Sequence, residues 1–460
     1  MDIPDIVSAV NRNRCKMKFI ASHFAENRRP LLVLMMFLVF AVGVLIAYRP
    51  IVTITCLMLG FLGILLPPSL LTWLAISMAP LQWTVIGLQN IPYKISCYDV
   101  IALLLVINFV WNGAIKKFSM FEQRLAYILA LFCLAGLISL TQAPYAMPGI
   151  YYLIRLGVVF ITFFSVIYFV REHSLEHSLS SLFACLWLLG IAAVINALQA
   201  PETVQSTVNL LLEDPGSAER LGSVYNQPNI TGHTIGLFLP IFFGSVFLPG
   251  QRRIIRLLSV ITTIFLSFVL IFTGSRGGML TGAIGLLILI FYLRRFSLLI
   301  IPLVLLGFFV FNWAFMREFF FDVRSLSMEN RINLIYYGLK TALEHPIAGI
   351  GLRQFNTHFH NMPFYLAGRS SHNAYLEVLV EMGILGFGVF IAFIVFVWKA
   401  LINTPDQKKQ FTTVLRGIAL SSFASLLCSK LFMGGLVLAT WWIALAFILG
   451  FMQRFYRSSF

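Results

Sequence analysis

Residues 370–400 read SSHNAYLEVLVEMGILGFGVFIAFIVFVWKA. After four polar residues the stretch is mostly apolar, and it exceeds the length of about 20 apolar residues that a transmembrane helix needs. The polar loop before it, 317–371, carries five arginines. The stretch therefore predicts a membrane-spanning helix over 373–400, with His372 at its mouth and cationic side chains close by.

The whole chain has the composition of a polytopic membrane protein. Of its 460 residues, 59% are hydrophobic and 11% are charged, and the mean hydropathy is +0.88. These values exclude an ordinary soluble domain. We expect an all-α protein with about 12–14 transmembrane helices, since several of the candidate stretches are short or nearly contiguous. The candidates run approximately over 30–48, 51–66, 69–88, 98–115, 121–140, 147–170, 179–200, 230–248, 254–273, 277–293, 297–314, 373–400, 411–430 and 433–453.

Polar segments divide the chain into five parts. The basic segment 1–29 has no small-residue cleavage site before a short apolar core, so it is predicted to remain as a cytoplasmic tail. N-terminal transmembrane helices follow over 30–200, and transmembrane helices with arginine-bearing outer loops occupy 201–316. A large extracytoplasmic loop over 317–372 precedes the C-terminal transmembrane helices over 373–460.

The distribution of the basic residues indicates that the net charge of +15 reflects membrane topology rather than nucleic-acid binding. With the N-terminus inside, most of the 33 Lys and Arg residues fall in inside segments, whereas the short outside loops carry only Arg49 and Lys94. This is the positive-inside bias, and it places both termini in the cytoplasm.

Three outer segments carry basic residues, which the positive-inside bias does not explain. The 201–232 loop, the Gly274–Gly278 turn and the 317–371 loop each follow an odd-numbered span, so all three lie on the same side. Their arginines suggest an anionic ligand. Alternatively, acidic neighbours such as Glu213 and Glu329 pair with some of them.

Arg276 lies in the tight turn Gly274-Ser275-Arg276-Gly277-Gly278. Glycines let the backbone approach a ligand closely, and a guanidinium offers bidentate donors that suit phosphate. A snorkelling arginine on a flexible turn would show the same sequence.

Arg220 and Asn226 belong to a second polar segment, which reads RLGSVYNQPN over 220–229. It is either a substrate-binding loop or a surface turn in which Arg220 pairs with Glu219 or Asp214. Arg155 lies inside a predicted span, where ionisable side chains usually face a cavity or a partner.

His372 is a candidate general base, because the ordinary pKa of histidine is near 6.5 and neighbouring arginines favour its neutral form. The alternative is structural: Ser370 or Ser371 caps the helix and His372 merely lies at the interface. Glu377 and Glu381 fall on other faces of the helix, so neither is an obvious orienting partner for His372.

The loop before His372 is predicted to contain its own helix. Ser327 is a candidate cap, and apolar residues recur at Ile332, Ile335, Leu339 and Leu343 until His345-Pro346 ends the pattern. Such an amphipathic helix lies in the membrane interface or roofs a cavity at the outer leaflet.

Several kinds of site have no counterpart in the sequence. It contains no paired-aspartate metal site, P-loop, His-Glu-x-x-His motif or nucleophile elbow. The six cysteines have no short-spaced pair, so neither a disulfide framework nor a metal site is expected. Phosphate binding would then depend on arginines, with no metal ion and no cofactor.

The ordered motifs over about 215–395 resemble those of the O-antigen ligase and polymerase superfamily of bacterial membrane glycan transferases. They comprise Arg220-Leu221-Gly222 with Asn226 and Pro228-Asn229, the turn at 274–278, Asn330-Arg331, the segment His345-Pro346-Ile347-Ala348-Gly349-Ile350-Gly351-Leu352 with Phe355, Ser371-His372-Asn373-Ala374-Tyr375-Leu376, and Glu381-Met382-Gly383-Ile384-Leu385-Gly386. Residues before 200 contribute only the number of spans and their topology.

The resemblance implies a C-type glycosyltransferase-like membrane fold in the bacterial inner membrane, with the active site facing the periplasm. It implies an undecaprenyl-pyrophosphate-linked glycan as donor and lipid A-core or a growing glycan as acceptor. His372 would deprotonate the acceptor hydroxyl, and Arg220 and Arg276 would bind the donor pyrophosphate. The residues that would line the substrate groove are Arg331, Arg353, Arg155, Asn226 and Tyr375.

Three functions remain open at this level. A ligase that joins O-antigen to lipid A-core is slightly favoured over a polymerase that uses the same chemistry. A transporter or flippase of lipid-linked glycan belongs to another class, but it would more often show charged or broken helices at the membrane midplane. A membrane scaffold would leave His372 and the outer arginines unexplained.

Overall fold

The computed structural model describes residues 66–83, 96–111, 118–199, 227–295, 325–360, 371–403 and 409–457. Every regular element in these ranges is helical, so the all-α prediction is confirmed. Six helices of the described ranges are long and apolar enough to cross a membrane: α6 (Met120–Ser139), α7 (Ala146–Glu172), α8 (Leu175–Gln199), α11 (Arg253–Phe272), α17 (Ala374–Ile402) and α18 (Lys409–Phe432). The other helices are α4 (Pro68–Ser77), α5 (Cys97–Trp111), α10 (Pro228–Ser245), α12 (Arg276–Tyr292), α15 (Ser325–Glu344), α16 (Phe355–Phe359) and α19 (Ala439–Arg457), with short 3₁₀ turns η1 (Ala79–Trp83) and η3 (Leu140–Gln142).

Most predicted spans that fall in the described ranges match these helices to within a few residues. The span predicted over 69–88 is described only as far as residue 83. There α4 ends at Ser77 and the 3₁₀ turn η1 follows, because Pro80 has no amide with which to continue an α-helix. The span predicted over 433–453 begins only at Ala439, after a loop that contains Gly435 with φ +75°. The spans predicted over 30–48 and 297–314, and 51–66 apart from its last residue, lie outside the described residues.

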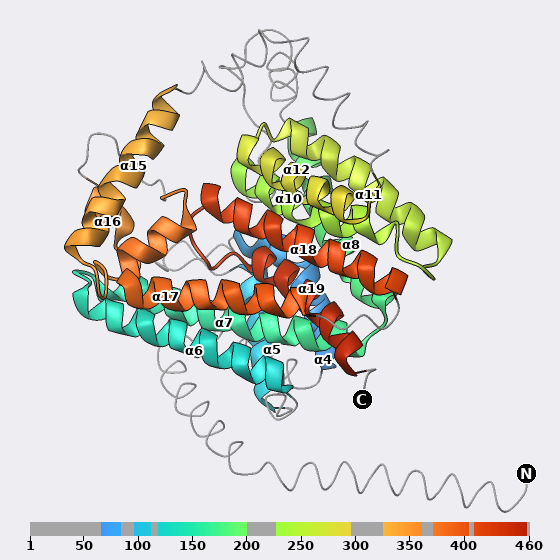
Figure 1. Cartoon of the computed structure of the whole chain (residues 1–460), viewed down its shortest axis with the longest axis horizontal. Helices are drawn as coiled ribbons and strands as arrows, with labels where there is room; N and C mark the ends of the chain where they lie inside the picture. Colours follow the sequence, from blue (N-terminus) through green and yellow to red (C-terminus); the bar gives the residue numbers. More distant parts are fainter. Residues whose placement is uncertain are drawn as a thin grey trace, which may run out of the picture.

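The helices form two groups that share α18. Figure 1 shows α6, α7 and α17 running side by side, with α18 and α19 next to them, while α10, α11 and α12 pack together on the far side of α18. Aromatic rings fill the core of the first group: Trp442 packs edge-on against Phe160 and Phe163, with centroid separations of 4.8 and 5.5 Å. Each such pair stabilises the packing by about 0.5–1.5 kcal/mol beyond simple burial.

Glycines let α10 and α12 approach closely at the end where α10 begins. A Cβ on Gly278 would lie 2.5 Å from the carbonyl carbon of Gly232, so only glycine permits this contact. Small residues at helix contacts are a common means of close packing in membranes. The contact sets the start of α10 against the α11–α12 turn, which contains Arg276.

The 345–351 loop, which precedes α16, forms hydrogen bonds with α17 where that helix is broken. Gly383 has φ +60° and ψ −161°, so α17 consists of two helical pieces joined at this residue. Backbone groups on either side of the break form hydrogen bonds with the loop. The amide of Ile350 donates to the carbonyl of Val380 at 3.0 Å, and the amide of Ile384 donates to the carbonyl of Pro346 at 2.8 Å. Backbone polar groups at membrane depth must be satisfied within the protein, and here the loop satisfies them.

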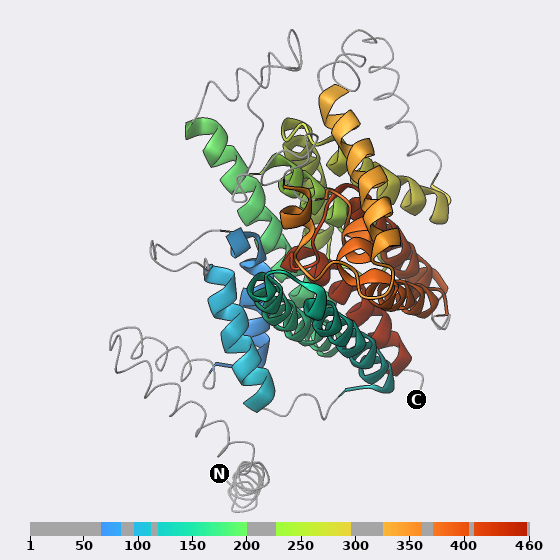
Figure 2. The same cartoon turned by 90° about the vertical axis from the view of Figure 1, so that its left-hand side faces the viewer.

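The predicted amphipathic helix of the large loop exists as α15, which begins two residues before the predicted cap Ser327 and ends before His345-Pro346. Figures 1 and 2 show α15 lying across the end of the group formed by α6, α7 and α17. The face packed on α17 carries Leu334 and Ala342 rather than the residues of the predicted stripe. That stripe is exposed: Ile332, Ile335, Leu339 and Leu343.

A buried ion pair lies at the opposite end of the first group. Arg171 near the end of α7 donates through Nη1 to the carboxylate of Glu122 at 2.7 Å, and both side chains are almost fully buried. Glu122 also closes a capping box with Ser119 at the start of α6. These charges therefore join α6 to α7.

Candidate active site

His372 lies in a short segment that hydrogen bonds hold on both sides. The side chain of Asn373 caps α17 by accepting from the amide of Leu376 at 3.0 Å. The hydroxyl of Ser371 accepts from the amide of Asn373 at 3.2 Å and donates to the carboxylate of Glu377 at 2.7 Å. Within the described residues, the cap is thus Asn373 and not the serine considered from the sequence.

The backbone of His372 adopts the left-handed conformation, with φ +53°. A residue other than glycine pays a conformational cost in this region, and such residues concentrate at functional sites. The hydrogen bonds of Ser371 and Asn373 maintain the conformation. The half-buried imidazole is consequently presented between two anchored residues at the mouth of α17.

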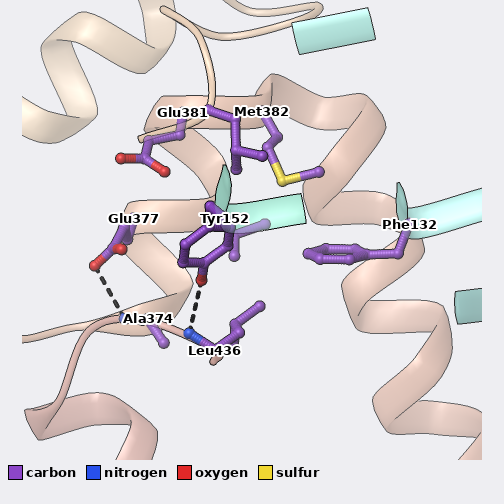
Figure 3. A pocket seen from close by; sticks show the side chains of 10 residues that line it. Phe132, Tyr152, Ala374, Glu377, Glu381, Met382 and Leu436 are labelled. Carbon is purple, nitrogen blue, oxygen red and sulfur yellow. Dashed lines mark hydrogen bonds between the residues drawn. The ribbon is translucent and has the colours of Figure 1, made fainter. Parts of the chain in front are cut away.

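The buried Glu377 connects this segment to the loop between α18 and α19. Its carboxylate accepts from the amide of Gly435 at 3.1 Å, the bond drawn in Figure 3. Lys430 reaches the same loop by donating to the carbonyl of Gly435 at 2.8 Å, and its charge interacts with that of Glu377. One carboxylate and one ammonium therefore fix the 433–438 loop beside His372.

Glu381, one turn further along α17, binds the loop before α16. Its two carboxylate oxygens accept from the amides of Arg353 at 2.9 Å and Phe355 at 3.0 Å. Phe355 is the first residue of α16, so the carboxylate satisfies a backbone amide at a helix start that has no partner within the helix. Glu381 thus binds a neighbouring segment, as its position around α17 indicates. Glu377 instead binds both the 433–438 loop and Ser371, which directly precedes His372.

Arg353 combines a left-handed backbone, with φ +65°, and a half-exposed side chain. Its guanidinium lies 5.5 Å from the ring centroid of Tyr152, and Nη1 is 3.9 Å from the Glu377 carboxylate. The hydroxyl of Tyr152 accepts from the amide of Leu436 at 2.8 Å, as Figure 3 also shows. Arg353 therefore lies at the edge of the network that holds His372.

Figure 3 shows a small cavity between Glu377, Glu381, Tyr152 and Phe132. It has room for about one water molecule. This cavity is too small for a sugar or a lipid headgroup. Its polar lining belongs to the network that supports the site.

The turn that carries Arg276 has its own cap. The hydroxyl of Ser275 accepts from the amide of Gly278 at 3.2 Å, so Arg276 is the first residue of α12. Backbone amides at a helix start attract anions. The half-buried Arg276 thus lies where both its side chain and the helix favour negative charge.

His233 of α10 contacts both α12 and α18, although it was not among the candidates predicted from the sequence. It is buried, its Nδ1 lies 3.2 Å from the hydroxyl of Thr281, and the charges of Arg331, Lys430 and His372 act on it. α12 and α18 therefore contact His233 directly, whereas Arg331 of α15 and His372 before α17 lie within electrostatic range of it. The available signal was an ionisable residue inside an apolar span.

The remaining candidates have other surroundings. Tyr375 donates its hydroxyl proton to the carbonyl of Leu427 at 3.1 Å, inside the bundle. Arg155 contacts Asp99 at 3.5 Å and the carbonyl of Gln82 at 3.3 Å. Arg220 and Asn226 lie outside the described residues. Arg331 and His372 lie within electrostatic range of His233, which contacts Gly277 next to Arg276. Arg353 lies 3.9 Å from the Glu377 carboxylate.

Part of the chain matches a known family model. Residues 261–391 match the model described as O-antigen ligase. The matched region runs from α11 into the second piece of α17 and contains Arg276, Arg331, Arg353 and His372. No curated protein matches the chain.

Proposed function

Since the chain belongs to the O-antigen ligase and polymerase superfamily, we propose that it transfers a glycan from an undecaprenyl-pyrophosphate-linked donor to an acceptor sugar. The reaction takes place at the outer face of the bacterial inner membrane. The observation that carries this proposal is that the ring of His233 contacts Gly277, next to Arg276, while Arg331 and His372 lie within electrostatic range of the same ring.

In this reaction the imidazole of His372 takes the proton of an acceptor sugar hydroxyl. The resulting oxygen attacks the anomeric carbon of the donor from the side opposite the pyrophosphate, so the configuration inverts. The bond between the anomeric carbon and the pyrophosphate oxygen breaks, and its electron pair leaves with undecaprenyl pyrophosphate. A positioned general base contributes about 10²–10⁴-fold to such a step.

Arg276 and Arg220 bind the pyrophosphate and stabilise the charge that develops on it. Guanidinium groups at a leaving phosphate act where charge appears in the transition state. The start of α12, with Arg276 as its first residue, supports this role for Arg276. The arginines supply the positive charge that the leaving group requires, so the proposal includes no metal ion.

We favour lipid A-core as the acceptor, which makes the protein a ligase. A polymerase would use the same residues on a growing glycan. The glycan pattern of a deletion strain distinguishes the two: free long chains indicate a ligase, and a single repeat on the core indicates a polymerase.

The test of the catalytic role is transfer from purified lipid-linked donor to acceptor in detergent. His372→Ala should reduce kcat by about 10²–10⁴-fold while the protein keeps its thermal stability. The matched control is His177→Ala, an exposed histidine at the start of α8, away from the candidate site. Normal turnover by folded His372→Ala would disprove the assignment of the base.

A further inference from the structure

His233 has no part in the mechanism above, yet its side chain is only 2% exposed and lies among the groups of the site. It belongs to the second turn of α10. A polar ring in this position must have a hydrogen-bond partner, because burying an unsatisfied polar group is costly.

The hydrogen bonds of His233 assign its tautomer. The hydroxyl proton of Thr281 is used in a bond to the carbonyl of Gly277 at 2.8 Å, so toward Nδ1 this hydroxyl can only accept. Nδ1 therefore carries the proton and donates to Thr281. Ser429 of α18 lies 3.1 Å from the same nitrogen and offers a second acceptor. The ring thus binds α12 and α18 together.

The other edge of the ring rests on the backbone of the Arg276 turn. A Cβ on Gly277 would lie 2.6 Å from Nε2 of His233, so the ring occupies the space that glycine leaves free. The ring of Phe432, at the end of α18, stacks on the imidazole with a centroid separation of 6.3 Å. His233 therefore fixes the distance between this turn and the end of α18.

The surrounding charges agree with this orientation. Arg331 from α15, Lys430 from α18 and His372 all act electrostatically on His233. With Nδ1 protonated, Nε2 keeps its lone pair and is the negative end of the ring. A neutral imidazole can lie beside cationic groups, whereas a protonated imidazole would be repelled by them.

We propose that His233 is a positioning residue that holds the Arg276 turn against the end of α18, so that Arg276 keeps its place relative to His372. This inference rests on the proposed function. His233 does not touch the reacting atoms, and its effect passes through Arg276. The loss of His233 should therefore weaken donor binding more than it slows the chemical step.

The experiment compares His233→Leu, His233→Asn and Thr281→Val in the full chain in detergent, with His177→Ala as control. Asparagine places an amide donor near the position of Nδ1, whereas leucine removes it. We measure kcat and KM for the lipid-linked donor, the affinity for undecaprenyl pyrophosphate alone, and thermal stability.

His233→Leu should raise the donor KM and weaken undecaprenyl pyrophosphate binding by about tenfold, the effect of losing one or two buried hydrogen bonds. His233→Asn should recover most of this loss, and kcat should change less than KM. Unchanged donor binding in His233→Leu, or equal losses with leucine and asparagine, would overturn the proposal.

If His233→Leu does not fold, Thr281→Val decides the question, because it removes the acceptor and preserves the volume. A normal donor KM in that variant contradicts the positioning role. A wild-type protein that neither binds undecaprenyl pyrophosphate nor transfers glycan refutes the proposed function itself, and the role of His233 falls with it. An active wild type with unaffected variants refutes only the role of His233.

Discussion

The buried carboxylate of Glu377 accepts a hydrogen bond from the hydroxyl of Ser371 at 2.7 Å, and Ser371 directly precedes His372. Glu377 thereby acts on the candidate base through its neighbour in sequence. The same carboxylate binds the amide of Gly435. The backbone conformation of His372 is consequently linked to the loop between α18 and α19.

Ser371→Ala should lower kcat by between about ten- and a hundredfold, because a base displaced by about 1 Å loses this much. The donor KM should change less, since the pyrophosphate contacts remain. Steady-state kinetics with the lipid-linked donor check this. A variant with an unchanged kcat would show that the Ser371–Glu377 bond does not place His372.

Arg276→Ala should weaken binding of undecaprenyl pyrophosphate by about 10–100-fold, the range for loss of charge-assisted hydrogen bonds. Arg276→Lys should recover only part of it, because lysine lacks the bidentate fork. The comparison variant is Arg252→Ala, a highly exposed arginine paired with Glu176 at the other end of the bundle. Equal affinities for Arg276→Ala and Arg252→Ala would exclude Arg276 from the donor site.

Gly383→Ala should destabilise the protein by about 1–3 kcal/mol or more, because its backbone conformation is nearly restricted to glycine. The new Cβ would also lie 2.7 Å from the amide nitrogen of Gly349. Gly388→Ala, in the second piece of α17, meets no atom within 4 Å and should be neutral or stabilising. Thermal unfolding in detergent compares the two, and similar midpoints would argue against the break at Gly383.

Arg171→Met should destabilise the protein by about 3–5 kcal/mol, because it leaves the Glu122 carboxylate buried without its partner. Donor affinity should stay unchanged in the folded protein, since this pair lies at the end remote from His372. The double variant Arg171→Met with Glu122→Leu should regain much of the stability. Additive losses in the double variant would show that the two residues are not coupled.

Periodicity and composition were sufficient to predict most of the helices, because a span needs only length and apolarity. They did not reveal the break in α17, since Gly383 lies in an apolar run and the groups that satisfy its neighbours come from the 345–351 loop. The packed face of α15 was also unpredictable. Contact with Leu376 selects the side with Leu334 and Gly338, although the side with Ile335 and Leu339 is more apolar.

The candidate site was predictable only in part. His372 and Arg276 stand out because they interrupt apolar stretches at the membrane surface. Capping of α17 by Ser370 or Ser371 is one alternative that the sequence offers, but Glu377 binds the hydroxyl of Ser371 and Asn373 caps the helix. His233 was missed because its importance comes from contacts with α12 and α18, which are distant in sequence.

The junction of the 345–351 loop with the break in α17 constrains how such chains can diverge. Gly349, Gly351 and Gly383 all have positive φ. A Cβ on Gly349 or Gly383 would meet the backbone of the other segment, and the amide of Gly351 donates to the carbonyl of Glu381 at 3.1 Å. The loop and the helix therefore form one structural unit. A substitution on either side has to preserve the backbone hydrogen bonds that Ile350 and Ile384 make across the junction.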